Sequence, residues 1–311
     1  MRYLVTGAAG FIGSNIVHEL LRRKHEVRGI DNFATGRREN IKGFVSDIEF
    51  IEGDIRDADA LKSAMQGVDV VLHQAAIPSV PRSIQDPATS HDVNVNGTLN
   101  ILTVARELGV RRIVNASSSS VYGDSPTLPK REDMPTNPLS PYAVSKLSAE
   151  RYCTVFSRVY DIEAVSLRYF NVFGPRQDPT SQYSAVIPKF ITAMQRGEQP
   201  VIFGDGEQSR DFTYVANVVE ANILASEAAL EEGISVNCAC HERTTLNDLV
   251  RQLNELLGTS IQPKYAPPRP GDIKHSYADI ALAQRTIGFR PNTDFKTGLK
   301  KTVAWYGENG G

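Results

Sequence analysis

The chain has 311 residues, enough for about two domains or one large α/β unit. Its 34 Lys and Arg residues nearly balance its 36 Asp and Glu residues, and the net charge of −2 argues against a nucleic acid or an anionic membrane as the main partner. A hydrophobic content of 41% with 23% charged residues excludes a mostly disordered chain.

Short β-rich runs alternate with amphipathic helical stretches over the first 170 residues. We expect strands at 3–6, 26–30, 48–52, 68–73, 112–117 and 164–168. Helices are expected between them at 12–23, 58–65, 92–107 and 142–160. This alternation predicts an α/β fold, with a parallel sheet covered by helices on both faces.

Proline and glycine become frequent after about residue 170, which is typical of a smaller, loop-rich substrate-binding region. We therefore expect a dinucleotide-binding domain at 1–170 and a substrate region at 171–208 and 231–311. The stretch 209–228 has the pattern of a strand end leading into a helix. We expect 209–230 to pack back on the first domain.

Nothing in the sequence indicates export or membrane insertion. No apolar run approaches the roughly 18 residues of a membrane helix, and the first five residues lead directly into a glycine-rich turn, leaving no room for a signal peptide. The three cysteines, Cys153, Cys238 and Cys240, cannot form a disulfide framework. We expect a cytoplasmic protein with reduced thiols.

The first expected strand runs into the turn Gly7-Ala-Ala-Gly10-Phe-Ile-Gly13, and a helix follows. Glycines at this spacing allow a tight turn, close approach of the backbone to a pyrophosphate, and close packing of helix on sheet. The helix start offers free N–H groups and a positive dipole end to the phosphates. The pattern predicts a dinucleotide site.

Acidic residues follow the second and third strands. Asp31 lies 24 positions after Gly7, where a carboxylate bonds the adenosine ribose and disfavours a 2′-phosphate, so NAD is favoured over NADP. Arg37 and Arg38 act against this preference, because nearby cations could tolerate a phosphate. Asp54, with Ile55, fits either an adenine contact or a helix cap.

Tyr142 and Lys146 lie four residues apart in an expected helix and so share one face. A lysine ammonium there can lower the phenol pKa, which is otherwise about 10, and can hold the nicotinamide ribose. The serines of 117–120 end a strand, where Ser118 can donate a hydrogen bond to a substrate oxygen. We interpret Ser118, Tyr142 and Lys146 as the catalytic residues of a redox site.

These motifs resemble those of the extended short-chain dehydrogenase/reductases, and among them the nucleotide-sugar 4-epimerases. The resemblance rests on the three glycines, Ser118, Tyr142-x-x-x-Lys146 and the stretch 168–175, and it covers essentially the whole chain. Segments 119–124, 139–146 and 205–212 are similar to UDP-N-acetylglucosamine 4-epimerases in particular. The resemblance implies a Rossmann-like, doubly wound parallel sheet with a smaller C-terminal α/β region that binds a nucleotide sugar.

The resemblance also implies two sets of contacts. Further NAD contacts are expected from Phe11, Ile12, Asn32, Thr35, Gly36, Gln74, Ala75, Ala76, Asn94, Ser117, Tyr169 and Val172. Substrate contacts are expected from Ser79, Val80, Ser118, Ser119, Tyr142, Asn171, Ala185, Val186, Phe203, Gln208, Arg210, Arg269, Asp272 and Ser276. Arginine suits such a site because it binds diphosphate bidentately.

The sugar is less well defined. Ser276 stands where the family's pocket-size residue is expected, and a serine there leaves room for a 2-acetamido group, although a shift of one residue would put Tyr277 in its place. Pro78 lacks a backbone donor where relatives contact substrate. We rank UDP-GlcNAc/UDP-GalNAc and UDP-Glc/UDP-Gal above UDP-glucuronate, because Asp178 would not favour a carboxylate.

The expected reaction is transient oxidation at C4 with NAD retained throughout, without net redox. A 4,6-dehydratase would need an Asp-Glu pair where Ser119 and Ser120 stand. A glucuronate epimerase or decarboxylase, and a non-catalytic NAD sensor, remain as alternatives.

Other features have simpler interpretations. The Cys238-Ala-Cys240-His241 run offers too few ligands for zinc, so no metal is expected, and His73 is expected to be a packed or hydrogen-bonded histidine. The apolar faces of 92–107 and 142–160 form an intersubunit bundle in the family, so a homodimer is expected.

Overall fold

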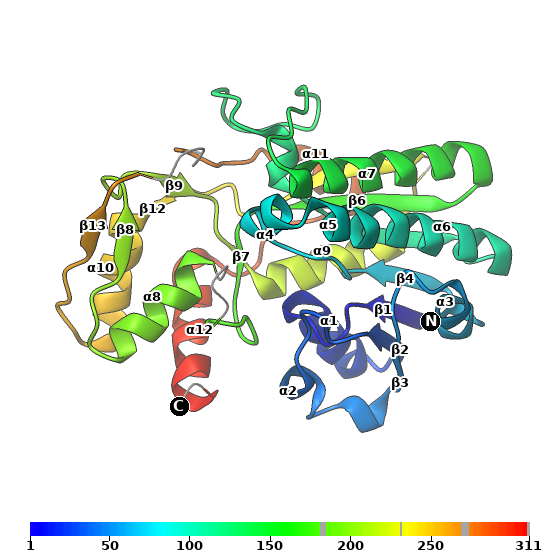
Figure 1. Cartoon of the computed structure of the whole chain (residues 1–311), viewed down its shortest axis with the longest axis horizontal. Coiled ribbons are helices and arrows are strands. Elements are labelled where there is room, and N and C mark those ends of the chain that lie inside the picture. Colours follow the sequence, from blue (N-terminus) through cyan, green and yellow to red (C-terminus); the bar gives the residue numbers. More distant parts are fainter. Residues whose placement is uncertain (181–184, 231, 269–273, 310–311) are drawn as a thin grey trace.

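The computed structural model describes residues 1–180, 185–230, 232–268 and 274–309 (Figure 1). Seven parallel strands form its main sheet, in the order β11-β6-β5-β4-β1-β2-β3. Their bounds are β1 Arg2–Thr6, β2 Glu26–Asp31, β3 Glu49–Glu52, β4 Val70–His73, β5 Arg112–Ser118, β6 Glu163–Tyr169 and β11 Ile234–Cys238. The predicted α/β class is confirmed, and the six predicted strands are all present.

The strand order reverses between β1 and β4, which are hydrogen-bonded neighbours. The chain runs outward from β1 to β2 and β3 on one side, and from β4 to β5 and β6 on the other. In an open parallel sheet, ligands bind outside the carboxyl ends of the strands at such a reversal. The glycine turn follows β1 at this point.

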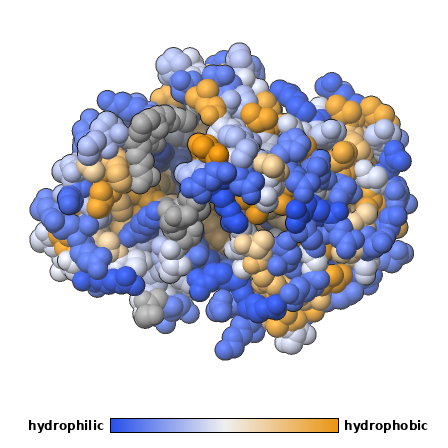
Figure 2. Space-filling model, in the orientation of Figure 1, coloured by the Kyte–Doolittle hydropathy of each residue, from blue (hydrophilic) through white to orange (hydrophobic). Residues whose placement is uncertain are grey.

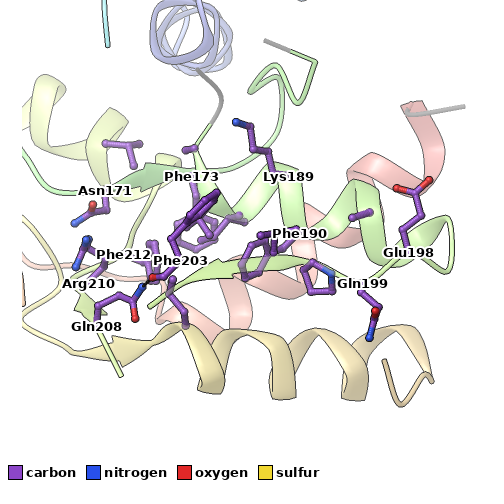
Figure 3. Close-up of a pocket in the computed structure, with 18 residues that line it drawn as sticks. Asn171, Phe173, Lys189, Phe190, Glu198, Gln199, Phe203, Gln208, Arg210 and Phe212 are labelled. Carbon is purple, nitrogen blue, oxygen red and sulfur yellow. Dashed lines mark hydrogen bonds between the residues drawn. The ribbon is translucent and has the colours of Figure 1, made fainter. Parts of the chain in front are cut away.

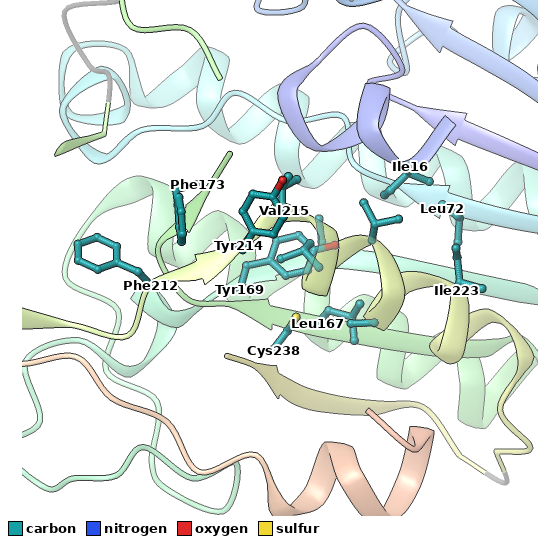
Figure 4. Packing of buried hydrophobic residues seen from close by; sticks show 14 of the residues in the cluster. Ile16, Leu72, Leu167, Tyr169, Phe173, Phe212, Tyr214, Val215, Ile223 and Cys238 are labelled. Atoms are coloured by element: carbon teal, nitrogen blue, oxygen red, sulfur yellow. The ribbon is translucent and has the colours of Figure 1, made fainter. Parts of the chain in front are cut away.

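Helices cover both faces of the sheet, as predicted. Tyr3 and Val5 of β1 join one apolar cluster with α1 (Phe11–Arg22) and α9 (Val215–Glu227), whereas Leu4 joins a second cluster on the opposite face. Figure 4 shows Leu72 of β4 and Leu167 of β6 packed near Ile223 of α9. The second cluster includes α3 (Ala58–Met65), α6 (Gly97–Leu108) and α7 (Pro141–Tyr160).

The predicted helix 92–107 begins differently from the expectation. Asp92–Asn96 form a π-helical segment, and α6 starts only at Gly97. A Cβ on Gly97 would lie 2.5 Å from Cδ1 of Ile55, so glycine permits this close approach.

Two short helices, α4 (Val80–Gln85) and α5 (Pro87–His91), precede that segment and were not predicted. Ser79 and Asp86 cap them, with a proline in the first turn of each. A capping residue followed by proline was the available sequence signal.

The rest of the chain forms a smaller region beside the sheet, where Figure 1 shows α8, β8, β13, α10 and α12 gathered together. The helices here are α8 Val186–Gln195, α10 Leu246–Leu257 and α12 Phe295–Asn309, whereas α11 Ala281–Ile287 packs against β11 and α9 of the sheet half. The short strands pair as β10 Thr213–Tyr214 with β7 Val172–Phe173, β12 Thr244–Thr245 with β9 Ser209–Arg210, and β13 Lys264–Ala266 with β8 Val201–Phe203. The remaining short segments are α2 Arg38–Ile41, η1 Val45–Asp47 and η3 Ser119–Tyr122.

Strand β11 departs from the predicted division of the chain, because it lies within 231–311 yet pairs with β6 in the main sheet. The polar Asn237 interrupts the apolar run that is typical of a buried strand, so the sequence pattern did not indicate β11. Asn237 is fully buried, and its side-chain oxygen accepts a 2.7 Å hydrogen bond from the Tyr122 hydroxyl. Its side-chain NH2 group donates to the carbonyls of Lys130 and Asp279 (3.0 Å each), so the amide is satisfied by long-range contacts that the sequence pattern does not reveal.

None of the helices in the described part of the chain combines the length and apolar character that crossing a membrane requires. The space-filling view shows the surface hollowed between the sheet half and the smaller region (Figure 2). The cavities described next are lined from these two parts of the chain.

Candidate active site

The turn between β1 and α1 needs its glycines. Gly7 has a φ of +68°, and a Cβ on Gly13 would lie 2.1 Å from the Gly7 carbonyl oxygen. The N-cap of α1, Gly10, makes no side-chain capping hydrogen bond. Because glycine has no side chain, the first N–H groups of α1 have no side-chain cap and suit a phosphate.

Asp31 ends β2 beside this turn and is only 8% exposed. Its carboxylate accepts hydrogen bonds from the N–H groups of Ala9 (2.9 Å) and Phe33 (2.8 Å). Burial raises the pKa of Asp31, and these two hydrogen bonds oppose the rise. A Cβ on Gly36 would lie 2.8 Å from both carboxylate oxygens, so glycine lets the backbone approach the acid.

Arg37 and Arg38, which the sequence left as possible phosphate ligands, are engaged in ion pairs. Arg38 makes two 2.9 Å hydrogen bonds to Glu52 and lies over the Phe33 ring. Arg37 lies 3.5 Å from Glu39 and 3.5 Å from Asp178. Both guanidinium groups are thus paired with carboxylates.

A cavity of about 600 Å³ runs along the glycine turn and the carboxyl ends of the central strands. It is lined by these predicted NAD contacts: Gly7, Gly10, Phe11, Ile12, Gly13, Asp31, Thr35, Gly36, Gln74, Ala75, Ala76, Ser117, Tyr142, Lys146 and Tyr169. A smaller cavity of about 130 Å³ shares Gly7 and Asp31 with it and contains Asn32, Asp54 and Ile55. The glycines, the open helix start and the buried acid fit the pyrophosphate and ribose of a dinucleotide.

The helix-cap interpretation of Asp54 is wrong for α3, because Asp57 is the N-cap and accepts from the N–H groups of Asp59 and Ala60. Asp54 instead pairs with Arg56 (2.7 Å) and accepts from Asn32 (2.8 Å). The hydrogen bond from Arg56 is the main reason that the pKa of Asp54 falls to about 2.

Two of the predicted NAD contacts lie elsewhere. Asn94 is not among the residues lining the cavity, because its amide is used inside the protein. It accepts from the Ile77 N–H (2.8 Å) and donates to the Ile77 carbonyl (3.2 Å) and the Ser145 hydroxyl (3.0 Å). Val172 lines a second cavity, described below.

The fold brings Ser118 and Tyr142 together although they are 24 residues apart. Ser118 ends β5 and Tyr142 lies in the first turn of α7, and their hydroxyls are hydrogen-bonded to each other. Helix α7 begins here because Ser140 caps it, accepting from the Ala143 N–H (3.2 Å). The Tyr142 N–H donates to the hydroxyl of Ser83 (3.0 Å), which anchors the helix start to α4.

Lys146 lies one turn after Tyr142, as the spacing predicted, but its ammonium donates to the Ala116 carbonyl (2.8 Å). Burial lowers the pKa of Lys146 to about 8. The pKa of Tyr142 is raised by burial, with the Ser118 hydrogen bond opposing the rise. The expected lowering of this pKa is wrong for the structure, because desolvation of the half-buried phenol dominates.

A buried charge network behind these residues was missed by sequence reasoning. Glu150, one turn after Lys146, accepts two 2.9 Å hydrogen bonds from Arg168 and a short one from the Ser117 hydroxyl. Arg168 also donates to the Tyr122 hydroxyl (2.8 Å). The spacing of four from Lys146 was the available sequence signal.

A second cavity of about 610 Å³ lies in the smaller region (Figure 3). It is lined by these predicted contacts: Asn171, Val172, Ala185, Val186, Phe203, Gln208 and Arg210. Ala185 lines both large cavities, so they adjoin. In Figure 3, Asn171, Gln208 and Arg210 lie at one end, Glu198 and Gln199 at the other, and aromatic rings between them.

Polar groups in this cavity have partners that orient them. Gln208 donates to the Phe203 carbonyl (2.6 Å), while its own side-chain oxygen is buried without a hydrogen-bond partner in the described structure. Arg210 donates to the carbonyls of Ser209 (3.0 Å) and Lys274 (3.2 Å). An orphaned buried acceptor beside a guanidinium suits a ligand with both donor and anionic groups.

The other predicted substrate residues are spread around the two cavities. Ser79 lines the first cavity, together with Pro78, while Val80 is 38% exposed and Ser119 starts η3. The Ser276 N–H donates to the Ser209 carbonyl (3.0 Å). Arg269 and Asp272 lie outside the described residues.

The interpretation of His73 as a packed, hydrogen-bonded histidine agrees with the structure. His73 is a buried core residue, and its ring nitrogens are hydrogen-bonded to Thr6 (2.8 Å) and Thr98 (3.0 Å). Cys238 and Cys240 are buried free thiols. In the described ranges, no cluster of three or more His, Cys, Asp or Glu side chains could hold a metal ion.

Comparison with known proteins identifies the family. Residues 3–239 match the model of the NAD dependent epimerase/dehydratase family. The chain is 42% identical over 308 residues to a putative UDP-glucose 4-epimerase of Methanocaldococcus jannaschii, covering 98% of each chain.

Two solved structures are also similar to this chain. A UDP-N-acetylglucosamine 4-epimerase from Methanobrevibacter ruminantium, in complex with UDP-N-acetylmuramic acid, has a TM-score of 0.95 and 42% identity, with 99% of this chain and 98% of that chain covered. A Thermus thermophilus UDP-glucose 4-epimerase complexed with NAD has a TM-score of 0.89 and 38% identity, with 98% and 99% covered.

Proposed function

The chain belongs to the NAD-dependent epimerase/dehydratase family, and we propose that it is a UDP-sugar 4-epimerase that oxidises the sugar transiently at C4. The observation that carries this proposal is the hydrogen-bonded pair of Ser118 and Tyr142, of which Tyr142 lines the first cavity together with Lys146. A non-catalytic NAD sensor needs no such pair of hydroxyls. Relatives with this activity support the same function.

The cofactor assignment follows from the family and the first cavity. The buried Asp31 would accept from the ribose hydroxyls, and the start of α1 would hold the pyrophosphate. A buried carboxylate there repels a 2′-phosphate, and Arg37 and Arg38 already have carboxylate partners. These features favour NAD over NADP.

The roles of the catalytic residues follow from their atoms. When bound, NAD supplies a reversible acceptor for the hydride of C4. The Tyr142 phenolate oxygen takes the proton of the C4 hydroxyl, and Ser118, hydrogen-bonded to it, orients that hydroxyl. The Lys146 ammonium, one turn after Tyr142 and lining the same cavity, would hold the nicotinamide ribose.

The second cavity is proposed to hold the UDP group while the sugar turns. Arg210 would bind the diphosphate, and the Gln208 oxygen would accept from a ligand N–H or O–H group. With the diphosphate held, the keto sugar can present its opposite face before the proton and hydride return. Roles for Arg269 and Asp272 around the UDP group belong to the same proposal.

Within the UDP sugars we propose UDP-GlcNAc/UDP-GalNAc as substrates, with UDP-Glc/UDP-Gal also accepted. Ser209 and His275 pair as an isolated parallel bridge, and their side chains are hydrogen-bonded (2.9 Å). Because side chains alternate along extended chains, Ser276 should share a face with Arg210, which lines the cavity. The Tyr277 hydroxyl is instead bonded to His241 (3.0 Å), which supports Ser276 as the pocket-size residue.

A substrate panel without added NAD tests the function. UDP-GlcNAc, UDP-Glc and UDP-glucuronate are incubated separately with purified protein, and the products are identified by chromatography and NMR. We expect the 4-epimer of UDP-GlcNAc. Conversion of UDP-Glc alone would contradict the open pocket at Ser276, a 4-epimer of UDP-glucuronate would redirect the substrate assignment, and a pentose product would indicate a decarboxylase. Absence of any product, even with NAD added, would contradict an epimerase.

A homodimer is part of the proposal. Helix α7 exposes an apolar stripe, distinct from the residues it packs on the sheet, formed by Val144, Tyr152, Val155 and Val159, whose exposed fractions range from 37% to 61%. A second copy of α7 and α6 would cover this stripe. Sedimentation that gives a monomer mass at micromolar concentration would contradict the dimer.

We also propose a cytoplasmic location. We further propose that different parts of the chain bind the cofactor and the nucleotide sugar. Three buried free cysteines suit a reducing compartment. Residues 1–170 with 209–230 would hold the cofactor, and 171–208 with 231–311 the nucleotide sugar, apart from β11, which completes the sheet.

A further inference from the structure

Residues 175–178, called here the 175–178 bridge, follow β7 in the chain and contact helix α1. Asn15 of α1 donates to the Pro175 carbonyl (3.1 Å) and accepts from the Arg176 guanidinium (3.2 Å). The same amide donates to the Phe11 carbonyl (2.9 Å), which fixes its orientation. One half-buried asparagine thus uses both ends of its amide to hold the bridge on α1.

The bridge is also held from the smaller region. The Tyr306 hydroxyl of α12 donates to the Gln177 carbonyl, and the Gln177 side chain donates to the Val172 carbonyl (3.2 Å). Gln177 and Asp178 line the first cavity together with Gly10 and Phe11 at the start of α1. The bridge therefore forms part of the cavity wall where the pyrophosphate would lie. It is distant in sequence from the glycine turn but lines the same cavity.

Asp178 brings a negative charge to this wall of the cavity. A carboxylate lining a site for an anionic pyrophosphate repels it unless the carboxylate is compensated. Asp178 lies 3.5 Å from Arg37, and its Oδ1 atom accepts from the Thr180 N–H (2.8 Å) and hydroxyl (2.7 Å). Arg37 does not line the cavity itself, so its effect on a dinucleotide would pass through Asp178.

We infer that Asn15 and Arg37 are positioning residues that keep the 175–178 bridge closed against bound NAD and slow its release. The inference rests on the proposed function, in which one NAD molecule must stay bound while the sugar is oxidised and reduced again. It adds a specific cause for that retention. The Asn15 amide holds one end of the bridge, and Arg37 compensates the charge of Asp178 at the other end.

Release of NADH tests the inference without any sugar. Protein loaded with NADH is mixed with a large excess of NAD, and the loss of bound-NADH fluorescence gives the release rate. We expect Asn15→Ala to raise this rate about 10-fold or more, because two hydrogen bonds to the bridge are lost. Asn254→Ala is the matched control, since Asn254 of α10 holds the backbone of Ile261 with its amide in the same way (2.9 and 2.8 Å), remote from the cavity.

The ion pair gives a second test on exposed side chains, where misfolding is not expected. Arg37→Ala should raise the release rate about 5-fold, and adding Asp178→Asn should restore it to within about 2-fold of the wild type, because the uncompensated charge is gone. The Arg37→Ala effect should shrink as salt is added. Arg22→Ala, at the far end of α1, controls for loss of one positive charge.

Release rates in Asn15→Ala and Arg37→Ala that match their controls would overturn the inference. So would an Arg37→Ala defect that Asp178→Asn leaves unchanged, since a general structural loss gives no such rescue. A wild-type protein that holds NADH but converts no UDP sugar would contradict the proposed function and leave slow release as a separate result. A wild-type protein that binds no NADH would overturn both.

Discussion

Glu150 of α7 and Arg168 of β6 face each other through two parallel hydrogen bonds of 2.9 Å, with side chains only 1% and 4% exposed. The same carboxylate accepts from Ser117, which lines the cofactor cavity. Lys146, one turn earlier on α7, is tied to the neighbouring Ala116 carbonyl. Two adjacent residues of β5 are thus fastened to two successive turns of α7, and this spacing holds Ser118 against Tyr142.

Glu150→Gln should destabilise the protein by about 3–5 kcal/mol, because the change leaves the Arg168 charge buried and uncompensated. Urea denaturation measures the free energy of unfolding. Glu255→Gln is the control: Glu255 pairs with Arg251 on the surface of α10 (2.9 Å, both side chains at least half exposed) and should change stability by no more than about 0.5 kcal/mol. Equal effects of the two changes would show that the buried Glu150 carboxylate does not support the packing of α7 on β5 and β6.

Tyr142→Phe should retain NAD and lose about 100-fold to 10,000-fold in turnover of the preferred UDP sugar, because only the proton-transfer group is removed. Bound cofactor is measured by absorbance after gel filtration, and turnover by NMR of the product. Tyr152→Phe, on the exposed face of the same helix, is the control. Turnover within about two-fold of the wild type would exclude Tyr142 as the base.

Ser276→Tyr should lower kcat/KM for UDP-GlcNAc by about 10-fold or more while affecting UDP-Glc less, because a bulky ring would fill the space for the acetamido group. The ratio of the two kcat/KM values is the measurement. Tyr277→Ser is the companion variant, since the Tyr277 ring lies against His241 with centroids 4.8 Å apart. A change in selectivity from Tyr277→Ser alone would mean that Tyr277, not Ser276, borders the sugar.

His73 should make folding sensitive to mild acid. Burial lowers its pKa from the usual 6.5 to about 3. Because the folded-state pKa is depressed, the unfolded chain binds the proton first, so the contribution to stability is complete above pH 6.5 and is lost as the pH falls below it. The loss should be about 1.4 kcal/mol per pH unit.

The difference between wild type and His73→Gln in urea denaturation, measured from pH 7.5 to 5, isolates this contribution. His73→Gln should flatten the dependence on pH, although it is less stable at neutral pH because two hydrogen bonds to threonines change. His91→Gln, on an exposed position of α5, should leave the slope unchanged. Parallel curves for wild type and His73→Gln would contradict a neutral buried imidazole.

Local sequence signals determined much of the fold and of the cofactor site. Apolar runs and helical periodicity located six strands of the sheet, and α3 was predicted with its observed bounds. Gly7 and Gly13 were predictable because a tight turn at a strand end accepts no side chain, and the structure leaves no space for one. Asp31 was predictable for a similar reason, since its place at the end of β2 follows from chain order alone.

Long-range contacts decided the remainder. Burial of the Tyr142 phenol reversed the expected direction of its pKa shift, and the use of the Asn94 amide inside the protein kept that side chain from lining the cavity. The polar Asn237 became part of the edge strand β11 because Tyr122, Lys130 and Asp279, all distant in sequence, satisfy its amide. A side chain's pKa, its partners and its burial depend on what the folded chain packs around it, and periodicity or spacing in the sequence carries no record of those neighbours.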